Sequence, residues 1–169
     1  MQLYLMRHGA ALDVGMPGVT RDAVRPLSPE GIAITIEVAR GLAAINVCPD
    51  GVAASPLIRA RQTAELIARG TGCKRAVAVC EGLAPGGRTA DVLEWRKTFA
   101  AEALLLVGHL PEIAMLASEL LAGHPNMNLA FKKAALCCIG FEAAPLPGNG
   151  CLEWFMPPRF LRPFGRSAS

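Results

Sequence analysis

The chain has 169 residues, a length typical of one domain, and its 52% of apolar residues excludes a disordered polypeptide. The net charge of +3 is small and evenly spread, so charge does not point to a nucleic-acid partner. The first apolar run meets Arg7 too early for a signal peptide, and no run approaches the roughly 18 apolar residues of a membrane span. We therefore expect a cytoplasmic protein that binds neither nucleic acid nor membrane.

The first half of the chain alternates predicted strands and helices. An apolar run over residues 2–6 predicts a buried strand, and glycines and prolines over residues 10–28 predict a loop. Ser28-Pro29-Glu30 is a helix start, with a capping serine, a proline in the first turn and an acid behind it. Residues 52–54 predict a second strand, after which Ser55-Pro56 repeats the same start for a second helix.

The second half continues this alternation and ends in a hairpin. Its predicted elements are a strand over 76–80, a helix over 89–101, a strand over 104–107, a helix over 111–121 and paired strands over 136–141 and 151–155, joined by a turn at 148–150. We expect a single domain over residues 1–156 and a packed or loose surface tail over residues 157–169.

Strands that alternate with helices predict parallel pairing, with helices on both faces of the sheet. The expected fold is therefore an α/β protein, a three-layer α/β/α sandwich with a mostly parallel central sheet and an antiparallel C-terminal edge hairpin. Ligands of such sheets bind at the carboxyl ends of the strands.

The six cysteines do not indicate a redox or zinc motif. No two of them have C-x-x-C spacing, so buried, reduced thiols are the favoured interpretation. They are Cys48, Cys73, Cys80, Cys137, Cys138 and Cys151.

Imidazole and guanidinium groups follow three of the predicted strands. Arg7-His8-Gly9 follows the first strand, Gly108-His109 follows the fourth, and Ser55 leads from the second strand into a helix that carries Arg59 and Arg61. Each feature alone is typical of a structural hydrogen bond or a solvated helix face. Together they suit phosphate chemistry, because guanidinium forks match phosphate oxygens and a neutral imidazole can attack phosphorus near pH 7.

Two other kinds of site fit the sequence poorly. A metal held by His8, His109 and His124 would want carboxylates or thiolates nearby, whereas the loops supply arginines, which repel a cation. The sequence also lacks the G-x-x-x-x-G-K-[ST] loop of nucleotide triphosphatases, because the glycines and lysine over residues 70–74 have the wrong spacing. We expect neither a metal nor a cofactor.

These motifs carry a resemblance to a known family. Met6-Arg7-His8-Gly9 resembles the R-H-G signature of the histidine phosphatase (phosphoglycerate mutase-like) superfamily, the segment 55–63 resembles its S-P-x-x-R-A-x-Q-T motif, and Gly108-His109 resembles its second catalytic histidine. Within the superfamily, three segments are similar to the SixA-type phosphohistidine phosphatases: Arg25–Gly31, Glu81–Gly87 and Gly108–Pro111. The resemblance extends from residue 1 to about residue 156.

The resemblance implies a role for four of these residues. His8 would be the nucleophile that takes the phosphoryl group. Arg7, Arg59 and His109 would hold the phosphoryl oxygens and stabilise the charge that develops on them.

Three further positions match the family with less definite roles. Ser55 opens the second motif and is either a helix cap or a neighbour of the phosphate. Arg25 is either a structural anchor or a substrate contact. Glu81 occupies the neighbourhood of the glutamate that acts as proton donor in much of the superfamily, although Gly-Leu-Ala-Pro follows it in place of the patterns usual in phosphoglycerate mutases.

The expected function is a metal-independent phosphatase in signal transduction. It would hydrolyse phosphohistidine on a signalling or phosphotransfer protein, such as a histidine phosphotransfer domain, through a covalent intermediate on His8. The alternatives are a phosphatase or mutase for small-molecule phosphate esters and, from a different class, an inactive phosphate-binding module.

Overall fold

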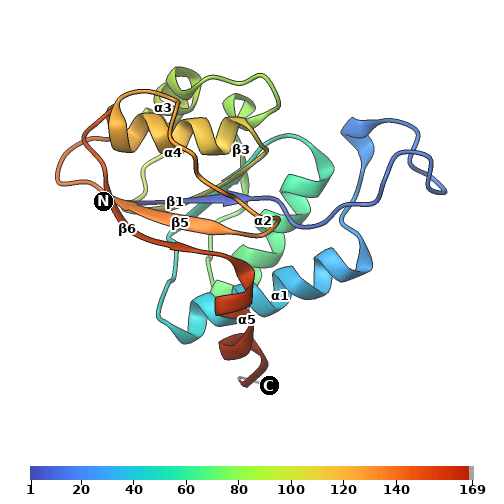
Figure 1. Ribbon diagram of the computed structural model, residues 1–169. Coiled ribbons are helices and arrows are strands. Elements are labelled where there is room, and N and C mark those ends of the chain that lie inside the picture. The colour runs from blue at the N-terminus through green and yellow to red at the C-terminus, as the bar shows by residue number, and fades with distance from the viewer. Residues whose placement is uncertain (168–169) are drawn as a thin grey trace.

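In the computed structural model, which describes residues 1–167, six strands form one sheet in the order β3-β2-β4-β1-β5-β6 (Figure 1). The strands are β1 (Gln2–Arg7), β2 (Gly51–Ala54), β3 (Ala78–Val79), β4 (Ala103–Gly108), β5 (Leu136–Gly140) and β6 (Cys151–Met156). The first four pair in parallel, whereas β5 runs antiparallel to β1 and β6 runs antiparallel to β5. The predicted parallel sheet with an antiparallel C-terminal hairpin at its edge is confirmed.

Helices cover both faces of this sheet. One face carries α1 (Pro29–Ala44), α2 (Ile58–Thr71) and α5 (Pro158–Ser167), and the other carries α3 (Thr89–Lys97) and α4 (Glu112–Ala122) (Figure 1). Two short 3-10 helices, η1 (Asp22–Val24) and η2 (Glu81–Leu83), lie in the segments that follow β1 and β3. The structure is therefore the three-layer α/β/α sandwich that the sequence predicts.

The pleat of the central strand β1 divides the core into two halves. Leu3 and Leu5 pack on one side of the sheet with Ile113 of α4, while Tyr4 and Met6 pack on the other side with the apolar residues of α1 and α2. Successive side chains of a strand point to opposite faces. Because helices cover both faces of the sheet, the sequence of β1 is a continuous apolar run. The carboxyl end of β1 brings Arg7 and His8 to the edge of the sheet.

Two helix boundaries differ from the prediction by more than one residue. The second helix begins at Ile58, with Leu57 as a cap that makes no side-chain bond, so the predicted start at Ser55-Pro56 is wrong. The third helix ends at Lys97, before the predicted residue 101. There the Thr98 hydroxyl donates to the carbonyl of Trp95 at 2.7 Å, a local bond that competes with continuation of the helix.

The C-terminal segment forms a helix that the sequence analysis did not predict. Helix α5 packs against α1, and its Leu161 side chain is completely buried. Arg162 and Arg166 both pair with the carboxylate of Glu37 on α1. The segment over residues 157–167 is thus packed against the α1 layer.

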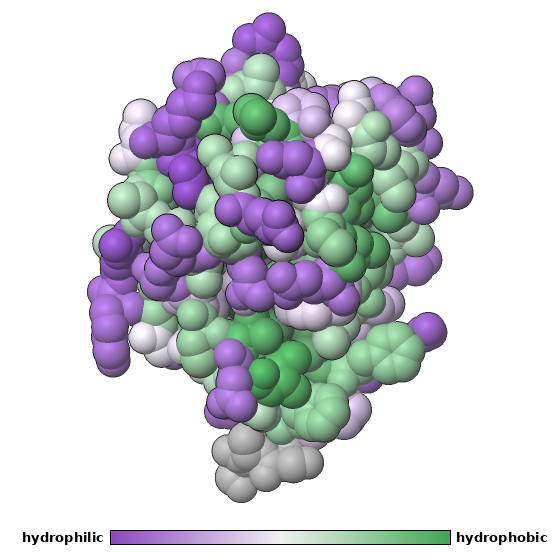
Figure 2. Space-filling view, turned by 90° about the vertical axis from the view of Figure 1, so that its left-hand side faces the viewer, coloured by the Kyte–Doolittle hydropathy of each residue, from purple (hydrophilic) through white to green (hydrophobic). Residues whose placement is uncertain are grey.

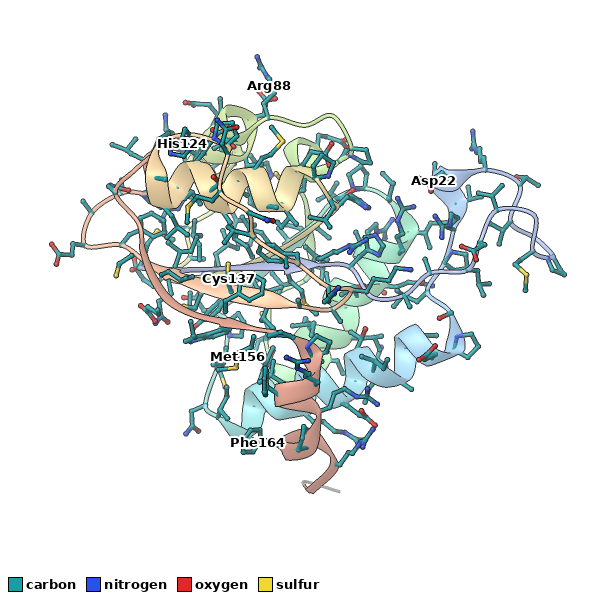
Figure 3. All side chains as sticks on the ribbon, in the orientation of Figure 1. Asp22, Arg88, His124, Cys137, Met156 and Phe164 are labelled. Atoms are coloured by element: carbon teal, nitrogen blue, oxygen red, sulfur yellow. The ribbon has the colours of Figure 1, made fainter. Side chains whose placement is uncertain are left out.

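The outer side of α5 remains apolar. Phe160 and Phe164 are 55% and 52% exposed, and Figure 3 places Phe164 on the outer side of the helix. Figure 2, which looks at that side of the molecule, shows hydrophobic atoms gathered at the same end. Among the residues described, no helix has the length and apolar character needed to cross a membrane.

Candidate active site

The sheet itself fixes the distance between the two histidines. Strands β1 and β4 are parallel neighbours in which Arg7 is the register partner of Gly108, so His8 and His109 are the next residues on each side. The His8 amide donates to the carbonyl of Gly108 at 3.1 Å. Adjacent strands lie about 4.8 Å apart, and the two imidazole ring centres are 5.0 Å apart. The pairing of the strands thus brings together the two histidines that the motifs singled out.

The hydrogen bonds of His8 define its tautomer. Its Nδ1 lies 2.6 Å from the carbonyl oxygen of Gly9, which can only accept, so Nδ1 carries the proton. Its Nε2 accepts a bond from Nε of Arg59 at 3.3 Å, so a lone pair remains on Nε2. The ring is 8% exposed, and burial lowers its pKa to about 3, an effect opposed by the Gly9 carbonyl and reinforced by nearby positive charges. His8 is therefore a neutral imidazole at pH 7.

His109 is the second buried, neutral imidazole. Burial, followed by the charge of Arg59, lowers its pKa to about 4, although the carboxylate of Asp22 acts in the opposite direction. Its Nε2 lies 2.9 Å from the hydroxyl oxygen of Ser55. Its Nδ1 is buried and has no hydrogen-bond partner among the residues described. The Ser55 hydroxyl thus contacts the second histidine and also accepts from the amide of Leu57, the N-cap residue of α2, at 3.3 Å.

Arg59 extends from the first turn of α2 into the site, where it is 5% exposed. Besides the bond from Nε to His8, its Nη1 donates to the carbonyl of Asp22 at 2.8 Å and its Nη2 donates to the carboxylate of Asp22 at 3.0 Å. A guanidinium has five N–H donors, so two remain. Thr63, one turn further along α2, accepts from the Gly9 amide at 3.1 Å and so fixes the helix to the loop behind His8.

Arg7 contributes the second guanidinium at this edge. Its Nη1 donates to the carbonyl of Phe131 at 2.9 Å, in the segment before β5. Its Nε is buried and has no partner among residues 1–167. Burial lowers its pKa from the usual value, but an arginine stays charged in proteins. The site therefore contains two cationic forks beside two neutral imidazoles.

The carboxylate that binds Arg59 in this site is Asp22, not Glu81. Glu81 is exposed at the start of η2, and no bond or ion pair among the described residues joins it to His8, Arg59 or His109. No motif in the sequence indicates Asp22. The only local signal is its position three residues before Arg25, because its second partner, Arg59, lies 37 residues further along the chain.

The remaining candidates from the sequence lie elsewhere. Arg61 is exposed on α2, with its Nη2 4.0 Å from Glu65. Figure 3 places His124 beyond the end of α4, where its Nδ1 accepts from the Asn126 amide at 3.3 Å. Within the described part of the chain, no group of three or more His, Cys, Asp or Glu side chains could hold a metal ion.

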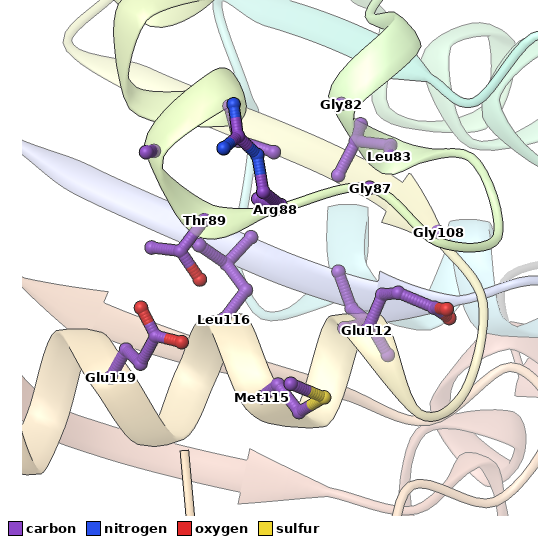
Figure 4. Close-up of a pocket in the computed structure, with 13 residues that line it drawn as sticks. Gly82, Leu83, Gly87, Arg88, Thr89, Gly108, Glu112, Met115, Leu116 and Glu119 are labelled. Atoms are coloured by element: carbon purple, nitrogen blue, oxygen red, sulfur yellow. The ribbon is translucent and has the colours of Figure 1, made fainter. Parts of the chain in front are cut away.

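A cavity of about 290 Å³ lies behind the second histidine (Figure 4). It is bounded by η2, the start of α3 and one side of α4, and its lining includes Gly108 but neither histidine. Glu112 of α4 accepts from the Gly86 amide at 2.7 Å and so ties α4 to the loop before α3. This cavity lies on the α3 and α4 side of the sheet, next to Gly108, the residue that precedes His109.

Comparisons with known proteins agree with this arrangement. The family model of the histidine phosphatase superfamily (branch 1) matches residues 3–84. An uncharacterised protein of Picosynechococcus sp. is 34% identical over 168 residues, which cover 96% of this chain and 100% of that protein. Phosphohistidine phosphatase SixA of Escherichia coli K12 is 31% identical over 167 residues, with 96% of this chain and 97% of that protein covered.

Solved structures give the same result. A structure of the protein histidine phosphatase SixA complexed with tungstate has a TM-score of 0.80 and 30% identity, and covers 95% of this chain and 99% of its own. A phosphoserine phosphatase of Entamoeba histolytica has a TM-score of 0.68 at 18% identity, a likeness that shows the fold alone, with 94% of this chain and 98% of its own covered. The chain belongs to the histidine phosphatase superfamily, within which it resembles the SixA-type phosphohistidine phosphatases.

Proposed function

We propose that this phosphatase hydrolyses phosphohistidine on a signalling or phosphotransfer protein, and that His8 carries the phosphoryl group between the two half-reactions. The observation that carries the proposal is the state of His8, which is buried and neutral and keeps an Nε2 lone pair next to a guanidinium. The likeness to proteins named phosphohistidine phosphatase supports the choice of substrate.

In the first half-reaction, the Nε2 lone pair of His8 gives up its hydrogen bond from Arg59 and forms a bond to phosphorus, and the bond between phosphorus and the substrate imidazole breaks. The electron pair of the broken bond stays on the leaving nitrogen. In the second half-reaction, water attacks phosphorus, orthophosphate leaves, and the electron pair of the Nε2–P bond returns to His8. Both steps place charge on the phosphoryl oxygens, which the free N–H groups of Arg7 and Arg59 can stabilise.

His109 is the proposed third donor to the phosphoryl oxygens. If the Ser55 hydroxyl donates to Nε2 of the neutral His109 ring, the proton of that ring sits on Nδ1. That buried N–H has no partner among the residues described, so it is available to an oxyanion. Ser55 would then act through His109, by selecting its tautomer.

The leaving group favours phosphohistidine over an ester. An imidazole can depart already protonated, whereas an alkoxide must receive a proton as it leaves. The carboxylate expected to donate that proton, Glu81, is exposed and forms no hydrogen bond or ion pair with the four site residues among those described. For the alternative function, hydrolysis of small-molecule phosphate esters, Glu81 is the proposed proton donor, and fold neighbours that include a phosphoserine phosphatase favour keeping that alternative.

The proposal includes a cytoplasmic location, a histidine phosphotransfer domain as partner, and catalysis without a metal. It is tested by comparing kcat/KM for a phosphorylated histidine phosphotransfer domain with kcat/KM for 3-phosphoglycerate and other small esters, in buffer that contains EDTA. We expect the phosphoprotein to be preferred at least about tenfold, equivalent to about 1.4 kcal/mol of transition-state binding. Rapid quench with labelled substrate should show an acid-labile, base-stable adduct, which His8→Ala removes together with turnover.

Three results would count against the proposal. A small ester that matches the phosphoprotein would favour the alternative substrate class. Turnover by His8→Ala would remove His8 as the phosphoryl carrier. Activity lost in EDTA and restored by a divalent ion would show that a metal takes part.

A further inference from the structure

One aspartate of the loop after β1 binds an arginine of the site. Asp22 lies on η1, in the segment that Figure 1 shows extending beyond the carboxyl end of β1 and that Figure 3 labels at this residue. Its carboxylate binds two arginines, with Oδ2 3.0 Å from Nη2 of Arg59 and Oδ1 3.0 Å from Nη1 of Arg25. Its backbone carbonyl accepts from Nη1 of Arg59 at 2.8 Å. One residue thus holds both terminal nitrogens of the buried guanidinium.

Arg59 needs such a partner for a physical reason. A buried cation is costly unless it is paired and hydrogen-bonded. Asp22 is the one carboxylate that forms an ion pair with Arg59 among the residues described, and its side chain is 56% exposed while that of Arg59 is 6% exposed. The negative charge of Asp22 acts on this group of residues, since its carboxylate pairs with Arg59 and opposes the lowering of the pKa of His109.

We propose that Asp22 is a positioning residue, which fixes the orientation of the Arg59 guanidinium beside His8 through both of its terminal nitrogens. This inference rests on the proposed function of Arg59 and His8 in phosphoryl transfer. Arg25 supports the arrangement from the other side, because its Nε donates to the carbonyl of Leu12, a bond that does not depend on Asp13.

The two roles of Asp22 have opposite effects on phosphate. Its negative charge opposes the binding of an oxyanion, so removing the charge should not weaken binding. Its two oxygens orient Arg59, so removing one acceptor should slow the chemical step, since preorganised donors matter most where charge develops. Asn offers one acceptor oxygen where Asp offers two, and therefore cannot bridge Arg25 and Arg59.

The chain offers a matched control. Asp13 lies on the same loop and pairs with Arg25 at 3.0 Å, but it makes no ion pair with Arg59 among the described residues, and its side chain is 90% exposed. Asp13→Asn changes the net charge by the same amount as Asp22→Asn. The pair therefore separates a contact with Arg59 from a general change in loop charge.

The test measures turnover of para-nitrophenyl phosphate and, separately, tungstate binding by calorimetry. For Asp22→Asn we expect kcat to fall at least about fivefold, while the Kd for tungstate rises less than about twofold. Asp22→Glu keeps both oxygens and should recover most of the lost kcat. Asp13→Asn should stay within about twofold of the parent in both measurements.

Two results would overturn the inference. One is an Asp22→Asn protein whose kcat matches that of Asp13→Asn. The other is a parallel loss of kcat, tungstate binding and thermal midpoint, which would show a merely structural role. Para-nitrophenyl phosphate is a general phosphatase substrate, so this comparison does not depend on phosphohistidine being the natural substrate. Failure of the Asp22 inference can therefore be told apart from failure of the phosphohistidine proposal.

Discussion

Two arginines at the start of α2 test whether the position of a guanidinium beside His8 determines activity. Arg59 and Arg61 are two residues apart, which is a rotation of about 200° on a helix, so their side chains point to nearly opposite sides. Arg59 is 5% exposed and donates to His8 and Asp22, whereas Arg61 has a 54% exposed side chain 4.0 Å from Glu65. Truncation to Ala should therefore have very different consequences at the two positions.

The magnitude follows from what each side chain does. Arg59→Ala removes both remaining guanidinium N–H donors and the Nε bond to His8, and loss of one preorganised oxyanion donor alone costs on the order of a hundredfold in kcat. A hundredfold corresponds to about 2.7 kcal/mol of transition-state stabilisation. Arg61→Ala removes a long surface ion pair, which is worth about 0 to 1 kcal/mol of stability and nothing in the chemical step.

The assay is kcat/KM for both variants with one phosphorylated substrate, with circular dichroism and thermal midpoints as folding controls. We expect a loss of about a hundredfold or more for Arg59→Ala and less than about threefold for Arg61→Ala. Similar losses in the two variants, with both folded, would refute the reasoning. Arg59→Lys should stay close to Arg59→Ala, because lysine keeps the charge but lacks the planar fork.

Two further outcomes are expected. Since burial places the folded-state pKa values of His8 and His109 at about 3 and about 4, below the ordinary 6.5, only the unfolded chain takes up these protons as the pH falls through 6.5. The free energy of unfolding should then decrease from pH 6.5 towards pH 5, and NMR of the folded protein should show both rings neutral throughout; a folded ring that titrates near pH 6.5 would contradict this. Gly31→Ala should lower the free energy of unfolding by about 1 to 3 kcal/mol in urea denaturation, because its Cβ would lie 2.0 Å from the Ala10 carbonyl oxygen; an unchanged midpoint would contradict that close packing.

The sequence predicts the parts of this fold that depend on local pattern. Apolar runs give the central strands, and the Ser28 side chain accepts from the Gly31 amide at 3.0 Å, as a helix-capping serine does. Helix α5 is different, because its prolines suggest a loop while its stability comes from burial of Leu161 and from Glu37, more than a hundred residues away. Patterns within a short window contain no information about such partners.

The same distinction applies to the site. Strand ends and motif spacing indicate His8, Arg59 and His109, since the carboxyl ends of neighbouring parallel strands meet at one edge. The contact between Asp22 and Arg59 depends on the path of the loop after β1. The glycines and prolines of that segment predict a loop, but they do not predict its path. Glu81 shows the converse, because a position that matches the family pattern is exposed and forms no hydrogen bond or ion pair with the four site residues among those described.

The location of the two histidines on neighbouring strands has a consequence for how the protein loses activity. Their spacing depends on the pairing of β1 with β4, and β1 is held on its other side by β5. Central strands open only with global unfolding, unlike loops, which open at small free-energy cost. Inactivation through the histidine pair therefore requires the cooperative loss of the whole sheet. Partial inactivation by heat or denaturant, below that transition, would then begin in the loop after β1, where opening separates Asp22 from Arg59 while the two histidines stay paired.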